Sequence, residues 1–200
     1  MRSRTLPVVL IALATVLMIV LPISLKYARQ DVLVFKSMTQ SAVSNCAMFD
    51  VHLGNEVQSM VIVCEKWEKG ECFKSDPVTI TPEVEEIRII TSERKKSGKG
   101  LEGINLQIGT DNQTGYFVTY FPVAENTSGW SYSSYKDEER IKAVPGEDRV
   151  LFCISFDTGK GVRSLDCETL SNNKEILKSY DFVILVRALF SSAEIAKQDS

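Results

Sequence analysis

The first 25 residues contain the longest apolar stretch of the chain, from Leu6 to Leu25 (LPVVLIALATVLMIVLPISL), and none of its side chains is ionisable. At a rise of about 1.5 Å per residue, a helix over this stretch spans about 30 Å, the thickness of the hydrocarbon core of a bilayer. The pattern therefore predicts that residues 1–25 form a single transmembrane helix, and that the protein contacts the membrane through residues 6–25.

The basic start of the chain, residues 1–4 (MRSR), would also suit a cleaved signal peptide. The apolar segment of such a peptide is about 7–15 residues long and is followed by a small-x-small cleavage site. The stretch here is longer, and a cut after Ala28 would place Lys26 where a small residue is needed. We therefore expect an uncleaved anchor, with cleavage as the alternative.

Residues 26–54 follow the apolar stretch and carry apolar or small side chains at an alternating four-three spacing. These positions are Ala28, Val32, Phe35, Thr39, Ala42, Cys46 and Phe49. The spacing is typical of the a and d positions of a heptad, so it predicts a helical stalk or connector over residues 26–54. Its expected interface residues are Val32, Phe35, Ala42 and Phe49. The run from Val32 to Phe35 also fits a first β-strand, because β-branched residues favour strands, and both interpretations stay open.

From residue 55 onward, short apolar runs alternate with turn residues. Several runs have a period of two, which places their apolar side chains on one face of a strand. The expected strands are Val57–Cys64, Val78–Ile80, Glu86–Thr91, Ile104–Ile108, Tyr116–Val123, Val150–Phe156, Val162–Leu165 and Phe182–Phe190, with short helices at Lys174–Lys178 and Ser191–Lys197. Many short strands joined by turns predict one β-rich domain over residues 55–200, mainly antiparallel and sandwich or barrel-like.

Residues 130–147 (WSYSSYKDEERIKAVPGE) have the least regular pattern in this domain. Three aromatic residues, Trp130, Tyr132 and Tyr135, precede a cluster of charges. Functional side chains concentrate in loops, so this segment is a candidate binding loop. The alternative is a solvated excursion of the surface.

The charge balance limits the partners that the protein can have. The chain has 23 Lys and Arg against 26 Asp and Glu, a formal net charge of −3. A protein that holds nucleic acid needs a basic face, so no nucleic-acid partner is expected. The hydrophobic and charged fractions, 44% and 24%, are ordinary for a globular chain and argue against long disorder.

The five cysteines favour disulfide bonds over a metal site. Zinc takes four ligands from closely spaced Cys and His pairs, whereas these cysteines are widely spaced and His52 is the only histidine. Two pairs flank turn-like segments and are therefore disulfide candidates, which leaves Cys46 unpaired. The pairs are Cys64 with Cys72, and Cys153 with Cys167. The alternative is that all five are free thiols in a reducing compartment.

Two Asn-x-Ser/Thr triplets, at Asn112 and Asn126, are glycosylation candidates. Together with the cysteines they favour a domain outside the cytoplasm. Basic residues nearly balance across the apolar stretch and do not fix the orientation by themselves. We therefore expect a single-pass membrane protein whose C-terminal domain is extracytoplasmic.

The chain lacks a reaction-specific motif. His52 is not accompanied by a Gly-x-Ser-x-Gly nucleophile motif, and Lys160 follows Asp157-Thr158-Gly159 where aspartic proteases have Ser or Ala. The expected function is therefore a membrane-anchored, non-enzymatic binding or assembly module without a cofactor. Its partner would be another protein or a second copy of itself. The alternative is a membrane-tethered enzyme that acts on envelope or cell-surface material.

The order of apolar helix, helical continuation and β-rich head is similar to that of type IV pilin-like subunits. The resemblance covers the layout alone. Pilin precursors carry a Gly before their cleavage point and a Glu five residues into the mature apolar segment. Here Arg4-Thr5 precedes the stretch, and residues 6–25 contain no Glu. A pilin-like subunit without that motif is a further alternative.

Overall fold

The computed structural model describes residues 30–40, 44–96, 99–111, 117–123, 127, 129–157, 161 and 164–193. Outside this part of the chain lie the predicted anchor at residues 1–25, the predicted interface residue Ala42, and the glycosylation candidates Asn112 and Asn126. Within the described ranges, no helix has the length and apolar character needed to cross a bilayer. Residues 31–200 form a compact unit separate from residues 1–30.

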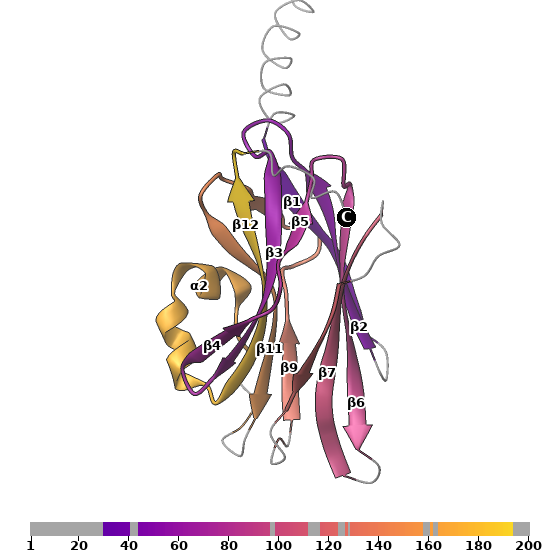
Figure 1. The fold of residues 1–200 in the computed structure, drawn as a ribbon, viewed down its shortest axis with the longest axis vertical. Helices are drawn as coiled ribbons and strands as arrows, with labels where there is room; N and C mark the ends of the chain where they lie inside the picture. The colour runs from indigo at the N-terminus through magenta and orange to yellow at the C-terminus, as the bar shows by residue number, and fades with distance from the viewer. Residues whose placement is uncertain are drawn as a thin grey trace, which may run out of the picture. The chain divides into compact units, whose positions relative to one another are not determined.

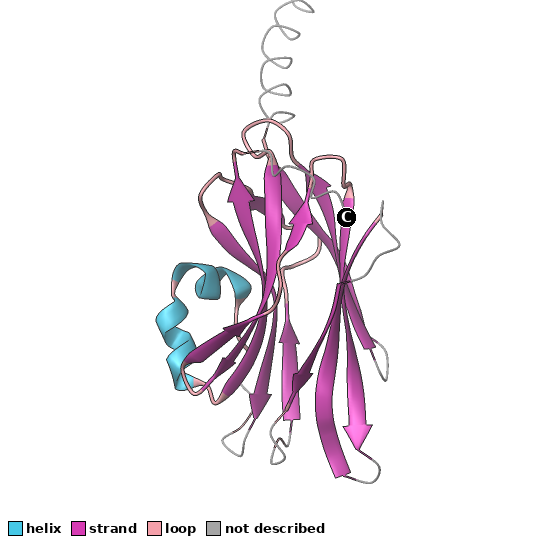
Figure 2. Ribbon diagram, viewed as in Figure 1, coloured by secondary structure: helices cyan, strands magenta, loops and turns pink. Residues whose placement is uncertain are grey.

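Two six-stranded antiparallel sheets make up this unit (Figures 1 and 2). Sheet A has the order β10-β1-β2-β6-β7-β8 and sheet B the order β4-β3-β12-β11-β9, with β5 pairing with β3. The strands of sheet A are β1 (Val32–Gln40), β2 (Ser44–His52), β6 (Glu86–Lys96), β7 (Lys99–Thr110), β8 (Phe117–Pro122) and β10 (Arg140–Lys142). Those of sheet B are β3 (Ser59–Glu68), β4 (Glu71–Lys74), β5 (Val78–Ile80), β9 (Gly129–Ser133), β11 (Asp148–Asp157) and β12 (Phe182–Ser191). The predicted mainly antiparallel, sandwich-like fold is confirmed.

The inner faces of the two sheets share one hydrophobic core. Alternate residues of each strand point inward because side chains of a strand have a period of two. Sheet A contributes Leu33, Phe35, Ala47, Phe49, Ile87, Ile89, Ile104 and Leu106, and sheet B contributes Ile62, Cys64, Phe152, Ile154, Ile184 and Val186.

A second hydrophobic cluster lies on the outer side of sheet B. Two short helices, α2 (Cys167–Asn172) and η1 (Lys174–Ser179, a 3₁₀ helix), cover Val183 and Leu185 of β12 there (Figure 2). The Asp166 carboxylate begins α2 by accepting a hydrogen bond of 2.7 Å from the backbone N–H of Thr169. β12 is therefore buried on both faces over most of its length, which explains why its sequence is apolar at every position from Phe182 to Phe190 except Arg187.

The predicted helical stalk over residues 26–54 is wrong, because β1 and β2 occupy most of this segment. Phe35 pairs directly with Phe49, and their rings meet edge to face with centroids 5.3 Å apart. A β-bulge between Phe35 and Ser37 shifts the inward phase of β1, so Met38 packs on the core as Phe35 does. A strand with such a shift has apolar residues three apart, which imitates helical spacing.

Two smaller expectations also changed. Residues 164 and 165, the described end of the predicted strand Val162–Leu165, have no regular structure and lead through Asp166 into α2. Ser191 ends β12 instead of beginning a helix, and residues 194–197 lie outside the described part. The predicted helix at Lys174–Lys178 corresponds to η1.

Replacing Phe35 by Ala should lower the free energy of unfolding by about 3–5 kcal/mol, because a buried aromatic side chain is lost from the core. Urea unfolding followed by tryptophan fluorescence measures this change. Val118→Ala is the control: its side chain is 55% exposed, and the change should stay within about 0.5 kcal/mol. Equal unfolding midpoints for the two variants would contradict the placement of Phe35.

Candidate functional site

The outer face of sheet A carries no helix among the described residues, in contrast to that of sheet B (Figure 2). Its side chains mix apolar and polar groups. Cys46 of β2 pairs with Ile90 of β6, and Met48 with Arg88; the apolar three are half-buried. This face is therefore an accessible surface on which a partner can bury apolar side chains.

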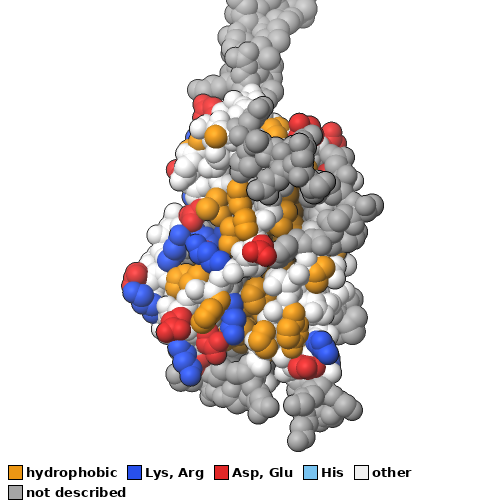
Figure 3. Space-filling model, viewed as in Figure 1, with side chains coloured by type: hydrophobic (Ala, Val, Ile, Leu, Met, Phe, Trp, Pro, Cys, Tyr) orange, Lys and Arg blue, Asp and Glu red, His pale blue; other side chains and the backbone are white. Residues whose placement is uncertain are grey.

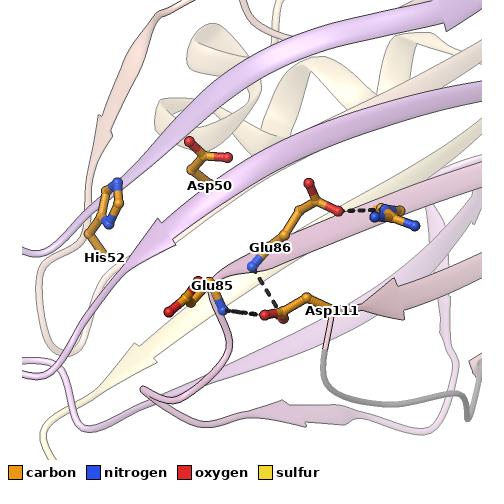
Figure 4. A pocket seen from close by; sticks show the side chains of 6 residues that line it. Asp50, His52, Glu85, Glu86 and Asp111 are labelled. Carbon is orange, nitrogen blue, oxygen red and sulfur yellow. Dashed lines mark hydrogen bonds and ion pairs between the residues drawn. The ribbon is translucent and has the colours of Figure 1, made fainter.

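One end of this face forms an open pocket of about 520 Å³ (Figure 4). Strands β2, β6 and β7 and the residues beside them supply its lining, which consists of Asp50, His52, Glu85, Glu86, Arg88 and Asp111. The lining has four carboxylates against one guanidinium. The pocket is therefore acidic and attracts cationic groups.

Asp111 holds the edge of the pocket in place. Its carboxylate accepts hydrogen bonds from the backbone N–H groups of Glu85 at 3.2 Å and Glu86 at 3.3 Å (Figure 4). Since Asp111 directly follows β7 and Glu86 begins β6, these bonds join the ends of two neighbouring strands.

Asp50 and Glu86 are direct cross-strand partners, an arrangement that places like charges opposite each other. Each of these two carboxylates forms an ion pair with a basic side chain. Lys36 Nζ lies 3.0 Å from Asp50, and Arg88 Nε lies 2.5 Å from Glu86. The described residues include no group of three or more His, Cys, Asp or Glu side chains that could hold a metal ion. The chemistry that this arrangement fits is charge pairing with basic groups of a partner.

The predicted binding loop at residues 130–147 is not one loop. Trp130 and Tyr132 lie in β9, which pairs with β11. The Trp130 indole N–H donates to Glu93 Oε1 at 2.9 Å, and the Tyr132 hydroxyl donates to the same oxygen at 3.3 Å. Glu93 belongs to β6, so these bonds join sheet B to sheet A. Burial, followed by the charge of Glu93, raises the pKa of Tyr132 to about 12.

The third aromatic of that segment, Tyr135, packs against both hydrophobic clusters. After it the chain enters β10, which pairs with β1 in sheet A. The three aromatic side chains therefore contribute to the packing and contacts within the sandwich, and they do not form an exposed binding loop. The predicted interface changes in the same way, because Phe35 and Phe49 are buried in the core, while Val32 is half-buried at the start of β1.

A second surface, on sheet B, also exposes apolar groups. Figure 3 shows hydrophobic side chains (orange) gathering over β3, β4 and β5, with Lys and Arg side chains (blue) nearby. Phe73 of β4 is 51% exposed, and Lys66 Nζ lies 5.7 Å from its ring centroid and 5.2 Å from that of Phe182. The Lys66 ammonium group thus lies beside both rings, while Phe73 remains half-exposed.

Arg187 of β12 is a charged group in the outer side of sheet B and is only 1% exposed. It forms an ion pair with Asp148, and its Nε lies 3.9 Å from Glu65. Burial alone would raise the pKa of Asp148, but the hydrogen bond from Lys174 and the charge of Arg187 outweigh it and lower that pKa. Because Arg187 is fully buried, removing one of its acidic partners would leave its charge less compensated inside the fold.

All five cysteines are free thiols, so neither predicted disulfide is present. For Cys64 and Cys72 the strand register gives the reason. Cys72 lies opposite Trp67, three residues from Cys64, so the two cysteines point to opposite faces of sheet B. Cys64 belongs to the core between the sheets, and Cys72 is exposed.

Cys153 and Cys167 lie in the same cluster beneath α2. Cys167 Sγ donates to the carbonyl of Ser133 at 3.6 Å, and Ser133 is the cross-strand partner of Cys153. Burial, as the largest cause, raises the pKa of both thiols. Sequence spacing therefore identified two neighbouring residues, and the structure contains them as protonated, buried thiols.

At pH 8, iodoacetamide should modify Cys72 first and Cys46 more slowly, and should leave the other three cysteines intact until the protein unfolds. The reactive species is the thiolate, and burial raises the pKa of Cys64 to about 12 and those of Cys153 and Cys167 as well. Peptide mapping after timed alkylation, with and without urea, measures the order. Rapid native modification of Cys153 or Cys167 would contradict it.

Comparison with known proteins adds no assignment to these side chains. The acidic pocket is built from residues that are far apart in the sequence, and its chemistry follows from their geometry. No family model, curated protein or solved structure matches this chain.

Proposed function

We propose that this protein is a membrane-anchored, non-enzymatic binding module that holds a basic segment of a partner protein on the outer face of sheet A. The observation that carries the proposal is the acidic pocket at the end of that face. Sheet B has its outer face occupied by α2 and η1, so sheet A offers the more accessible surface.

Charge and apolar contact have separate parts in this binding. Lys or Arg side chains of the partner approach Glu85, Glu86 and Asp50, while its apolar side chains cover the neighbouring Met48 and Ile90. Complementary charge speeds association and fixes the orientation of the partner. Binding of this kind weakens as salt rises, because the pocket is open to solvent and exposed charges are screened.

The anchor in this proposal is the uncharged stretch at residues 6–25. Its length suits one crossing of a bilayer, and it precedes a folded unit that begins at residue 31. We place this unit on the extracytoplasmic side, with support from the two Asn-x-Ser/Thr triplets at Asn112 and Asn126.

Glu85→Lys should weaken the binding of an octalysine peptide about ten-fold, because the exposed carboxylate of the pocket becomes a cation. Titration of residues 30–200 in ¹H–¹⁵N NMR gives both the affinity and the residues affected. The wild type should show shifts concentrated at the residues that line the pocket. Raising the salt concentration from 50 to 300 mM should abolish them.

The matched control is Asp76→Lys, which makes the same change of net charge at an exposed position between β4 and β5 of sheet B. It should bind octalysine almost as the wild type does. Equal losses in the two variants would mean that the peptide responds to net charge alone, and the acidic pocket would then not be the binding site.

Anchoring and orientation have a test of their own. The full chain should remain in the membrane pellet after alkaline carbonate washing, and a membrane-impermeant maleimide added to intact cells should label it at the exposed Cys72. Cys72→Ser should remove most of that label. Labelling only after the membrane is permeabilised would place the domain on the cytoplasmic side, and release by carbonate would contradict the anchor.

A further inference from the structure

β8 is the free edge of sheet A, since its described pairing is with β7 alone. Free edges present unpaired backbone groups, and proteins protect them with short strands or charged side chains. The edge strands β10 (RIK) and β4 (ECFK) have both kinds of protection. β9 (GWSYS), at the other edge of sheet B, is also uncharged but is shorter than β8, whose sequence is FVTYFP.

Two of the four exposed large hydrophobic side chains of the described residues lie on β8. Val118 is 55% exposed and Tyr120 is 39% exposed. Both point to the outer face of sheet A, while Phe121 points into the core. β8 therefore combines a free backbone edge with an apolar outer surface.

Tyr120 is held firmly in this position. Its ring lies over Gly103, where a Cβ atom would be only 2.4 Å from the ring. Its hydroxyl donates to the carbonyl of Glu102 at 3.2 Å, and the Arg94 guanidinium lies 5.7 Å from the ring centroid. The edge is thus preorganised before any contact with another strand.

The hydrogen-bond pattern shows which backbone groups face outward. The N–H of Val123 donates to the carbonyl of Glu102 on the β7 side. In an antiparallel pair the direction alternates along the strand, so Thr119 and Phe121 also turn their backbone groups toward β7. The backbone N–H and C=O groups of Val118 and Tyr120 consequently point away from β7, where another strand can pair with them.

We propose that two copies of this chain associate by antiparallel pairing of β8 with β8, with Val118 of one copy opposite Tyr120 of the other. A two-fold axis then passes between the two Thr119 residues. Each Val118–Tyr120 pair exchanges both backbone hydrogen bonds, and the β-branched side chain packs against the aromatic ring. The contact is self-complementary, as two-fold symmetry requires.

The register that places Tyr120 opposite itself is less favourable. A shift that places Tyr120 opposite itself puts Val118 opposite Pro122, which has no N–H to donate. Pro122 is tolerated in the free strand because its missing donor faces outward, as in other edge strands. Because β8 is uncharged, bringing two copies together creates no charge repulsion along the strand. These features favour a second copy of this chain as the occupant of the edge.

The association makes one continuous sheet of the two A sheets and leaves their outer faces on the same side. Association through β8 does not involve the residues of the acidic pocket, so it is independent of the proposed function. One short strand buries little area, so the expected dimer is weak and forms reversibly at high protein concentration.

Cysteine cross-linking of the full chain in detergent tests the register. In a Cys46→Ser, Cys72→Ser background, Thr119→Cys should form a disulfide-linked dimer on oxidation with copper phenanthroline. The two Thr119 residues form a pair without mutual backbone bonds, with Cα atoms about 4.5 Å apart, within the range of a disulfide. Val118→Cys is the control, because its two copies are diagonal neighbours about 7–8 Å apart. Equal cross-linking of the two variants would overturn the register.

A second substitution tests the backbone hydrogen bonds. Adding Val118→Pro to the Thr119→Cys chain removes an outward N–H and leaves the bonds to β7 in place. The cross-linked fraction should fall about ten-fold, because each copy loses a donor. If the proline variant melts early, Val118→Lys, which changes only an exposed side chain, replaces it. Cross-linking that persists in a folded Val118→Pro or Val118→Lys protein would overturn the proposal.

Discussion

The burial of β12 on both faces is the constraint on which the rest of the structure depends. Its inner face completes the core between the sheets, and its outer face is too apolar to be left in water. α2 and η1, the two described helices, both cover this outer face of sheet B. No helix of the described residues lies on the outer face of sheet A, whose side chains are mixed in character.

The two sheets therefore differ in what their outer surfaces offer to a partner. Sheet B holds the second apolar cluster and the buried Arg187, both of which belong to the packed interior of the domain. Sheet A places charges at one end of its surface and an uncharged strand at its edge. A partner protein and a second copy would therefore meet the same sheet at different positions, without competing for one set of residues.

Local pattern was sufficient for strands that contain no bulge. Val78–Ile80 and the core of Phe182–Ser191 were predicted correctly from their apolar residues. β1 was harder to predict from the sequence, because its bulge after Phe35 changes the spacing of apolar residues within the strand. Trp130 and Tyr132 resembled loop residues because their partner, Glu93, lies in the other sheet. The acidic pocket could not be predicted, since it depends on the register of β2, β6 and β7.

The contact between Tyr120 and Gly103 has a consequence for how this sequence can vary during evolution. A side chain at position 103 meets the end of the Tyr120 ring, so a mutation there requires the ring to move aside or position 120 to become smaller. The reverse order is also constrained, because losing the ring first exposes a glycine in the middle of a strand, where it is unfavourable. The two positions should therefore co-vary among descendants of this protein, and the pair would mark the β7–β8 edge in sequences too divergent to align by their other residues.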